Sequence, residues 1–249
     1  MRILAILTVY NEISYLPLKY QWCKEQGLDI YVIDNYSNDG TWNWIREQGI
    51  PSHRVDTNNS FDLRILQAEI VKTIHKIKPD WVVYNGADLF FLTENKLCAD
   101  IAMADSRGYN LIMMDFISMF YTGEKRNCFD PFNKYFYYRY INKLQMIHKY
   151  DPNVVYEADC VKVPSPNILE NEGCIVNYGQ TKSKKRRIET TRRREKAWKD
   201  GLPANYGNHY KKGMAVDWQW KKEDLEDVRK SKYFKYFQKH LLHLGKTSD

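Results

Sequence analysis

The sequence predicts an α/β fold in which a mostly parallel sheet is flanked by helices, and three observations predict it. Short apolar runs that suit buried strands alternate with amphipathic stretches that suit helices through the first 115 residues. The connections between these segments are short, as they are in parallel sheets covered on both faces. Of the 249 residues, 43% are hydrophobic, which is enough to build one large domain.

Five strands and four helices are expected in this region. The strands are short apolar runs at 3–9, 30–33, 53–55, 81–84 and 111–114. The helices lie between or after them at 15–26, 41–48, 61–77 and 96–106. Each helix is followed by a residue that stops it, in order Gly27, Gly49, Pro79 and Gly108.

The alternation ends beyond Phe116. We expect a single domain over 1–249, in which 1–115 binds the ligand, 116–180 faces a second substrate, and 181–249 forms basic and amphipathic C-terminal helices. Within the middle region, the aromatic stretch 129–140 suits either a platform for sugar rings or buried core. Two short strands are expected around the PSPN turn at 164–167. The last helix is expected at 222–244.

The charge and the cysteines narrow the class of protein. A net charge of +7 and a pI of about 9.0 indicate a surface that attracts phosphates of a nucleotide, an anionic membrane or a nucleic acid. Five cysteines without CxxC spacing favour reduced thiols. No apolar run approaches the ~20 residues that span a membrane. We therefore expect a cytoplasmic protein that can make peripheral contact with an anionic membrane.

Polar residues follow three of the predicted strands. Tyr10, Asn11 and Glu12 follow the first strand, Asp34 follows the second and Asp88 the fourth. Ligands of open parallel sheets bind beyond the carboxyl ends of the strands, so we expect these residues to share one site. Each segment alone is also an ordinary strand end or turn. We expect Asp34 to serve the ligand and not the fold, because a buried charge is costly unless it is paired.

The order of these segments resembles a family 2 glycosyltransferase of the GT-A fold. That family opens with a strand, a YNE-like turn, a helix and a strand ending DN.S.DGT. The corresponding segment of this chain is TVYNEISYLPLKYQWCKEQGLDIYVIDNYSNDGT. Its DW....DaDEF segment is similar to PDWVVYNGADLFF, and its HYg..s.e....K segment is loosely similar to NYGQTKSKKRRIETTRRREKAW. The resemblance covers residues 1–115 well and 170–200 loosely.

The resemblance implies an inverting, Mn- or Mg-assisted transferase of the hexosyltransferase type. It would move a sugar from a nucleotide-diphosphate sugar to a hydroxyl of a glycan or glycoconjugate acceptor. Tyr10, Asn11 and Glu12 match the turn against the base and ribose, and Asp34 matches the acid that accepts hydrogen bonds from the nucleotide. Arg64 falls where the family often places a basic residue near the nucleotide.

Asp88 matches the second acid of the family's DxD-type motif, which holds a divalent metal. Three family positions differ in this chain: Gly86 replaces the first acid, Leu89 replaces the Glu after the motif, and Asn177 replaces the His of HY. Three alternatives follow. Asp88 holds the metal with waters and phosphate oxygens, His209 supplies a missing ligand, or Lys and Arg side chains replace the metal's charge.

The basic run at 182–194 has a functional and a plain interpretation. Lys182, Lys184 and Arg187 are candidates to bind the diphosphate, and the run also suits anionic lipid. The plain alternative is a solvated helical face. For the catalytic base, the resemblance implies a carboxylate. We expect either Asp115, which ends the predicted fifth strand, or Glu172.

Three other functions compete with this one. A nucleic-acid-binding protein would use the basic run and the aromatic stretch, although nucleic acid is the less favoured partner. A catalytically inactive relative is suggested by Gly86 and Leu89. A sugar nucleotidyltransferase would need a glycine-rich turn after the first strand to hold a triphosphate, and no glycine precedes Gly27.

Overall fold

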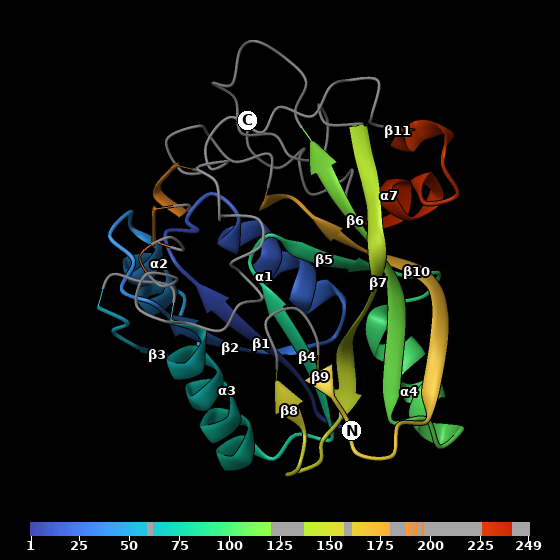
Figure 1. The fold of residues 1–249 in the computed structure, drawn as a ribbon, viewed down its shortest axis with the longest axis horizontal. Coiled ribbons are helices and arrows are strands. Elements are labelled where there is room, and N and C mark those ends of the chain that lie inside the picture. The colour runs from blue at the N-terminus through green and yellow to red at the C-terminus, as the bar shows by residue number, and fades with distance from the viewer. Residues whose placement is uncertain are drawn as a thin grey trace.

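Four parallel strands form the first half of the central sheet, in the order β3-β2-β1-β4 (Figure 1). The computed structural model describes residues 1–58, 62–120, 137–156, 161–179, 188–190, 192–193, 196 and 226–240. The four strands are β1 (Ile3–Val9), β2 (Asp29–Asp34), β3 (Ser52–Arg54) and β4 (Trp81–Gly86). The helices of this half are α1 (Leu16–Glu25), α2 (Thr41–Glu47), α3 (Leu63–Ile77) and α4 (Leu97–Ser106). The predicted fold class is confirmed.

Two of the helix stops have a clear physical cause. Gly27 follows α1 with φ +71°, a left-handed conformation that glycine adopts without strain. A Cβ at this position would lie 3.0 Å from the Cys98 sulfur, so the glycine also lets α1 approach α4 closely. Lys78 ends α3 in the left-handed region just before Pro79, which cannot continue a helix.

The second half of the sheet mixes strand directions. β7 (Tyr137–Lys149) runs antiparallel to both β4 and β6 (Leu111–Phe120), and β10 (Ile168–Asn177) runs parallel to β6. β5 (Leu89–Leu92) is the last strand of the path, and β11 (Glu226–Asp227) pairs with β7. β8 (Val155–Tyr156) and β9 (Val161–Lys162) form a separate two-stranded sheet. The described C-terminal residues add a 3-10 helix, η4 (Val228–Lys230), and α7 (Phe234–His240).

The sheet curls, and one short turn shows that it must. Ala87 and Asp88 alone connect β4 to β5, although β7, β6 and β10 lie between those two strands in the sheet. In a flat sheet, four inter-strand spacings would separate them by about 19 Å. Two linking residues reach only about 10 Å. The curvature therefore brings the carboxyl ends of β4 and β10 to the same place.

Both faces of the sheet are covered. Trp81 and Tyr84 in β4 point to opposite faces because they are three residues apart. The Trp81 indole N–H donates to Asp105 of α4 (3.0 Å), whereas the Tyr84 ring packs edge-on against Tyr156 of β8 (5.5 Å between centroids). α1 lies on the α4 face, and α3 lies on the other. Within the described residues, no helix is long and apolar enough to cross a membrane.

Two predicted segments differ from the structure. β6 continues to Phe120 instead of ending at residue 114, because β7 and β10 pair with it along its length. The helix predicted at 222–244 is confirmed at 234–240, which forms α7, and is wrong at 226–233, where β11 and η4 lie. There Glu226 pairs with Tyr138 of β7 and accepts a hydrogen bond from its hydroxyl (2.8 Å). Residues 129–136 of the aromatic stretch lie outside the described residues.

A histidine is fully buried between the two sheets. His148 in β7 donates through Nδ1–H to the Lys149 carbonyl (2.8 Å), because a carbonyl oxygen can only accept. Its Nε2 therefore accepts from the Tyr156 hydroxyl (2.8 Å). Burial lowers the pKa of His148 from 6.5 to about 4. The imidazole stays neutral in the folded protein.

We expect the free energy of unfolding to fall by roughly 3 kcal/mol as the pH drops from about 6.5 to about 4. Over this window the unfolded chain protonates His148 while the folded protein does not, so acid favours unfolding. Urea unfolding at pH 7 and pH 4.5 measures the change. H148F gives the contribution of all other groups, and a wild-type loss no larger than that of H148F would contradict the prediction.

Candidate active site

The register of three strands brings their carboxyl ends to one rim. In β1, Val9 pairs with Asp34 of β2 and Thr8 pairs with Gly86 of β4. Neighbouring strands lie about 4.8 Å apart, so the ends of β2 and β4 are separated by about 10 Å across β1. The turns that follow the three strands, at 10–12, 35–41 and 87–88, therefore start side by side.

The first two turns are fastened to each other by hydrogen bonds. The Asn11 N–H donates to the Ser37 hydroxyl (2.7 Å), and the Asn11 side-chain oxygen accepts from the Asn38 N–H (2.7 Å). The Glu12 N–H donates to the Thr41 hydroxyl (2.8 Å). Asn11 has φ +52°, a left-handed conformation that asparagine tolerates. Much of the polar character of this rim therefore holds its own backbone in place.

Asp34 is fully buried and paired within the protein. Its carboxylate accepts from Arg54 Nε (2.9 Å) and from the Ser37 N–H (3.1 Å). Arg54 also donates to the Ser37 carbonyl (2.7 Å), and its guanidinium lies 4.3 Å from the centroid of the Tyr36 ring. We expected Asp34 to serve a ligand and not the fold. The expectation that it does not serve the fold is wrong. The carboxylate fixes the turn and holds Arg54 at the rim.

Part of the predicted basic run lies across this rim. Tyr10 donates its hydroxyl to Glu189 (2.7 Å), and the Arg193 guanidinium lies 3.3 Å from the centroid of the Tyr10 ring. Residues 188–190, 192–193 and 196 are helical. Four of the predicted ligand-binding residues lie outside the described residues: Lys182, Lys184, Arg187 and His209.

Asp88 lies beside the end of β10. Its carbonyl accepts from the Tyr178 N–H (2.9 Å), and the neighbouring Leu89 pairs with Asn177. A Cβ built on Gly179 would lie 2.9 Å from the Asn177 side-chain oxygen and 3.1 Å from Asp88 Oδ2. The Asn177 side-chain oxygen accepts from the Gly179 N–H (2.6 Å), so this oxygen and Asp88 Oδ2 both lie beside Gly179.

This oxygen pair suits a divalent metal that takes only part of its ligands from the protein. Mg²⁺ prefers oxygen ligands and often takes only one or two from the protein, with phosphates and waters completing its shell. Within the described ranges, no group of three His, Cys, Asp or Glu residues could hold a metal alone. Asp88 and Asn177 would therefore be the protein's described contribution to such a metal.

The other three predicted residues lie apart from this pair. Arg64 is exposed at the start of α3, where it pairs with the helix cap Asp62 (2.9 Å). Glu172 is exposed in an irregular part of β10, and its carbonyl accepts from Tyr236 of α7 (3.3 Å). It lines a separate cavity of about 230 Å³.

Asp115 lies within β6 and does not end it. Its carboxylate accepts from Lys232 Nζ (2.8 Å) and from the Tyr233 hydroxyl (2.9 Å). Ser118, three residues further along β6, is level with Asn177. Asp115 is therefore about 10 Å from the row of Asp88 and Asn177 along the strand. The sequence could not reveal this pairing, because its partners lie more than 100 residues away.

Three residues at the rim were not among the predicted site residues. Arg54 ends β3, the shortest of the four parallel strands, and its position at the carboxyl end of that strand was the available signal. Asn177 was noted only as a replacement for histidine, although replacement by another oxygen donor preserves a ligand. Arg193 belongs to the basic run, but nothing in the run distinguishes it from its neighbours.

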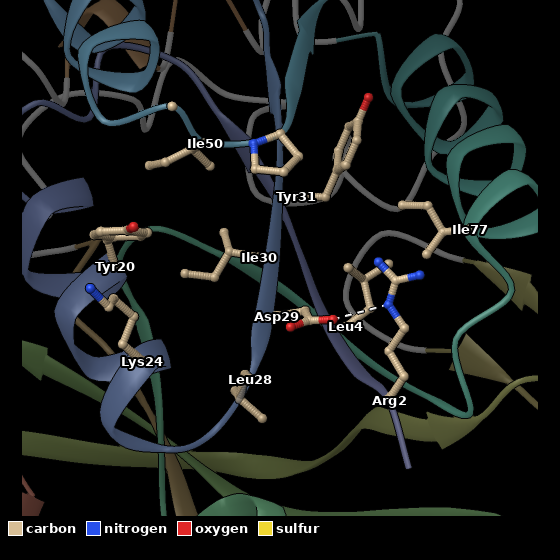
Figure 2. Close-up of a pocket in the computed structure, with 12 residues that line it drawn as sticks. Arg2, Leu4, Tyr20, Lys24, Leu28, Asp29, Ile30, Tyr31, Ile50 and Ile77 are labelled. Carbon is tan, nitrogen blue, oxygen red and sulfur yellow. Dashed lines mark hydrogen bonds and ion pairs between the residues drawn. The ribbon is translucent and has the colours of Figure 1, made fainter.

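A cavity of about 460 Å³ lies elsewhere, at the amino ends of β1 and β2 (Figure 2). Tyr20 and Lys24 of α1 border it on one side and Ile77 of α3 on the other, and an ion pair between Arg2 and Asp29 (3.0 Å) crosses it. Its lining is mainly apolar, and none of the rim residues described above contributes to it. The cavity is separate from the candidate active site.

No protein-family model and no curated protein matches the chain. Among solved structures, it is similar to S. aureus TarS (15% identity, TM-score 0.40, over 54% of this chain and 24% of that one). It is also similar to S. aureus TarS 1–349 in complex with UDP-GlcNAc (14% identity, TM-score 0.39, over 54% of this chain and 39% of that one). A third similar structure is glucosyl-3-phosphoglycerate synthase from Mycobacterium tuberculosis in complex with Mn²⁺, UDP and glucosyl-3-phosphoglycerate (15% identity, TM-score 0.34, over 46% of this chain and 44% of that one). The matched region spans less than half of each of these proteins, so function is inferred from this chain's own residues.

We expect both R54A and D34A to destabilise the protein, R54A by about 3 kcal/mol and D34A by about 2 kcal/mol. R54A leaves a carboxylate that is 0% exposed without its cation, whereas D34A leaves a guanidinium side chain that is 28% exposed and can reach water. Urea unfolding at neutral pH measures both. A D34A variant as stable as the wild type would show that the ion pair does not support the fold.

Proposed function

We propose that the chain is a glycosyltransferase. It transfers a sugar from a nucleotide-diphosphate sugar to a hydroxyl of a glycan or glycoconjugate, with a divalent metal such as Mn²⁺ or Mg²⁺. The observation that carries the proposal is the rim itself. An oxygen pair lies where β4 and β10 end, formed by Asp88 and Asn177. Two cations lie along the same rim: Arg54 at the end of β3, paired with Asp34 of β2, and Arg193 on the ring of Tyr10 after β1.

The chemistry of sugar transfer suits this arrangement. A nucleoside diphosphate leaves readily only if cations meet the negative charge that builds on it. A metal held by Asp88 and Asn177 would supply charge stabilisation at the diphosphate. Arg54 and Arg193 supply fixed positive charge at the same rim, and guanidinium groups bind phosphate oxygens in pairs. The aromatic faces of Tyr10 and Tyr36 lie beside these cations and suit a base or a sugar ring.

We further propose that the enzyme works in the cytoplasm. Cys23, Cys98 and Cys174 are free thiols in the structure. Free thiols are typical of reducing compartments.

A thermal-shift panel of UDP-, GDP- and dTDP-sugars, with Mn²⁺ or with a chelator, tests the donor class. A ligand at 100 times its Kd stabilises the native state by about 2.7 kcal/mol, so the correct nucleotide should raise the melting temperature measurably. The rise should be larger with Mn²⁺. A panel in which no nucleotide sugar shifts the melting temperature under either condition would overturn the proposal.

We expect D88N to lose at least about tenfold in nucleotide affinity with Mn²⁺, equivalent to about 1.4 kcal/mol, and to change little with a chelator. The substitution removes the charged oxygen ligand while keeping the shape of the side chain. Isothermal calorimetry with UDP or the nucleotide found in the panel measures the affinities. D29N makes the same change at the opposite end of β2 and serves as the matched control. Equal Mn²⁺ effects in D88N and D29N would contradict the metal role.

We expect G179A to weaken the Mn²⁺ effect as well, because its methyl group would occupy the space on which the Asp88 and Asn177 oxygens converge. A contact of 2.9 Å to the Asn177 oxygen must push that side chain aside. Affinity measured with a chelator serves as the internal control, since no ligand oxygen is removed. A G179A protein with the full Mn²⁺ effect would place the metal elsewhere.

A further inference from the structure

A lysine is buried in the aromatic layer beneath the Asp88 turn. Lys19, in the middle of α1, is 0% exposed. Its ammonium lies 4.0 Å from the centroid of the Trp22 ring, 5.0 Å from that of Phe90 and 5.4 Å from that of Phe91. A buried charge destabilises a protein unless it is well paired, and a methionine would fill the same space without that cost. The charge therefore needs an explanation beyond packing.

The ammonium group is bound to the backbone next to Asp88. Lys19 Nζ donates to the Leu89 carbonyl (2.5 Å), one residue beyond Asp88. Within the described residues, Lys19 forms no ion pair with a carboxylate. Burial lowers the pKa of Lys19 to about 8, while the charges of Cys23 and Asp88 act to raise it.

Two consecutive carbonyls, of Asp88 in the turn and of Leu89 at the start of β5, accept hydrogen bonds from other segments. The Asp88 carbonyl accepts from the Tyr178 N–H of the chain after β10, and the Leu89 carbonyl accepts from Lys19 of α1. The turn must bring β4 and β5 together within two residues, and Gly86 and Ala87 offer no polar side chain to fix it. Lys19 and Tyr178 hold it from two different elements.

The same layer contains other polar groups that a core built for stability would not contain. Asn85, the residue before Gly86, is buried, and among the described residues neither its amide nitrogen nor its amide oxygen has a hydrogen-bond partner. The indole N–H of Trp22 is likewise buried without a partner. Such groups cost stability, and they concentrate where function requires it. These buried polar groups therefore make the interior beneath Asp88 less stable than an apolar core would be.

We propose that Lys19 is a positioning residue of the active site, whose ammonium group fixes the Asp88 turn so that the carboxylate is aimed at the metal and diphosphate. This inference rests on the proposed function for its ligand, but the positioning itself is a property of the free protein. A lysine with a structural role alone would stabilise the fold. A lysine that positions Asp88 is kept despite its cost to the fold.

The test compares Lys19→Met with Cys23→Ala. Cys23 lies one turn further along α1 and is equally buried, but it does not contact the Asp88 turn through a hydrogen bond. Three quantities are measured: the melting temperature, the hydrogen-exchange rate of the Tyr178 amide without ligand, and UDP affinity with Mn²⁺ and with a chelator. Lys19→Gln, which keeps an N–H donor without the charge, provides a second variant if Lys19→Met does not fold.

In Lys19→Met we expect a melting temperature equal to or above that of the wild type. We expect the Tyr178 amide to exchange at least about tenfold faster, because the turn that accepts its hydrogen bond has lost a charge-assisted contact. The Mn²⁺ enhancement of UDP affinity should fall by about tenfold, as for other residues that support a metal ligand. Cys23→Ala should lower the melting temperature and leave the other two quantities unchanged.

The failures of the two proposals are distinguishable. A wild-type protein that binds no nucleotide overturns the proposed function, but the exchange measurement still tests the positioning. Unchanged Tyr178 exchange in Lys19→Met, or in Lys19→Gln if the former does not fold, overturns the role of Lys19. So does a Lys19→Met protein that is less stable than the wild type and keeps the full Mn²⁺ enhancement.

Discussion

The parallel pairing of β1 with β2 on one side and β4 on the other is the constraint on which the site depends. Because Val9 is level with Asp34 and Thr8 with Gly86, the turns after β2 and β4 each start one strand spacing from the turn after β1. A shift of register by one residue would turn every side chain of a strand to the opposite face and expose the core. The buried apolar residues of β1 therefore fix the position of the polar residues beyond it.

The polar residues at the rim divide into those that hold the backbone and those that remain for a ligand. Asn11 and Ser37 are occupied by hydrogen bonds between the first two turns, and Asp34 accepts a hydrogen bond within the second turn. The ion pair of Asp34 with Arg54 belongs to both groups, because the buried carboxylate aims a partly exposed cation at the rim. Preorganised charges of this kind need no rearrangement when a charged ligand binds.

The sequence predicted what depends on local patterns and failed where partners are distant in the chain. The predicted strands and helices of the first 115 residues follow from apolar periodicity and from stops such as Gly27, and the structure has them within a few residues. β5 was not predicted, because the short run Leu89–Leu92 becomes a strand only by pairing with β10. The end of β6 was missed because strand length is set by neighbours, and both neighbours of β6 follow it in the sequence. Asp34 could be placed at the rim, but its pairing with Arg54 depends on the β2–β3 register. Lys19 gave no signal, because burial of a lysine depends on the aromatic residues of β5 that lie about 70 positions away.

The replacements at Gly86 and Asn177 have a consequence for how a metal and a nucleotide would bind together. Among the described residues, Asp88 supplies the one carboxylate of the oxygen pair, and Asn177 supplies a neutral oxygen. The protein alone therefore offers a metal few ligands. On the proposed function, the diphosphate must supply most of the remaining oxygens. The metal would then bind weakly without nucleotide, and the nucleotide would bind weakly without metal. Each ligand would raise the affinity for the other by the same factor, because the coupling of two ligands is reciprocal. On the same proposal, the cations Arg54 and Arg193 would reduce this dependence by attracting the phosphates directly. A site with a single acid could then still suit a charged donor.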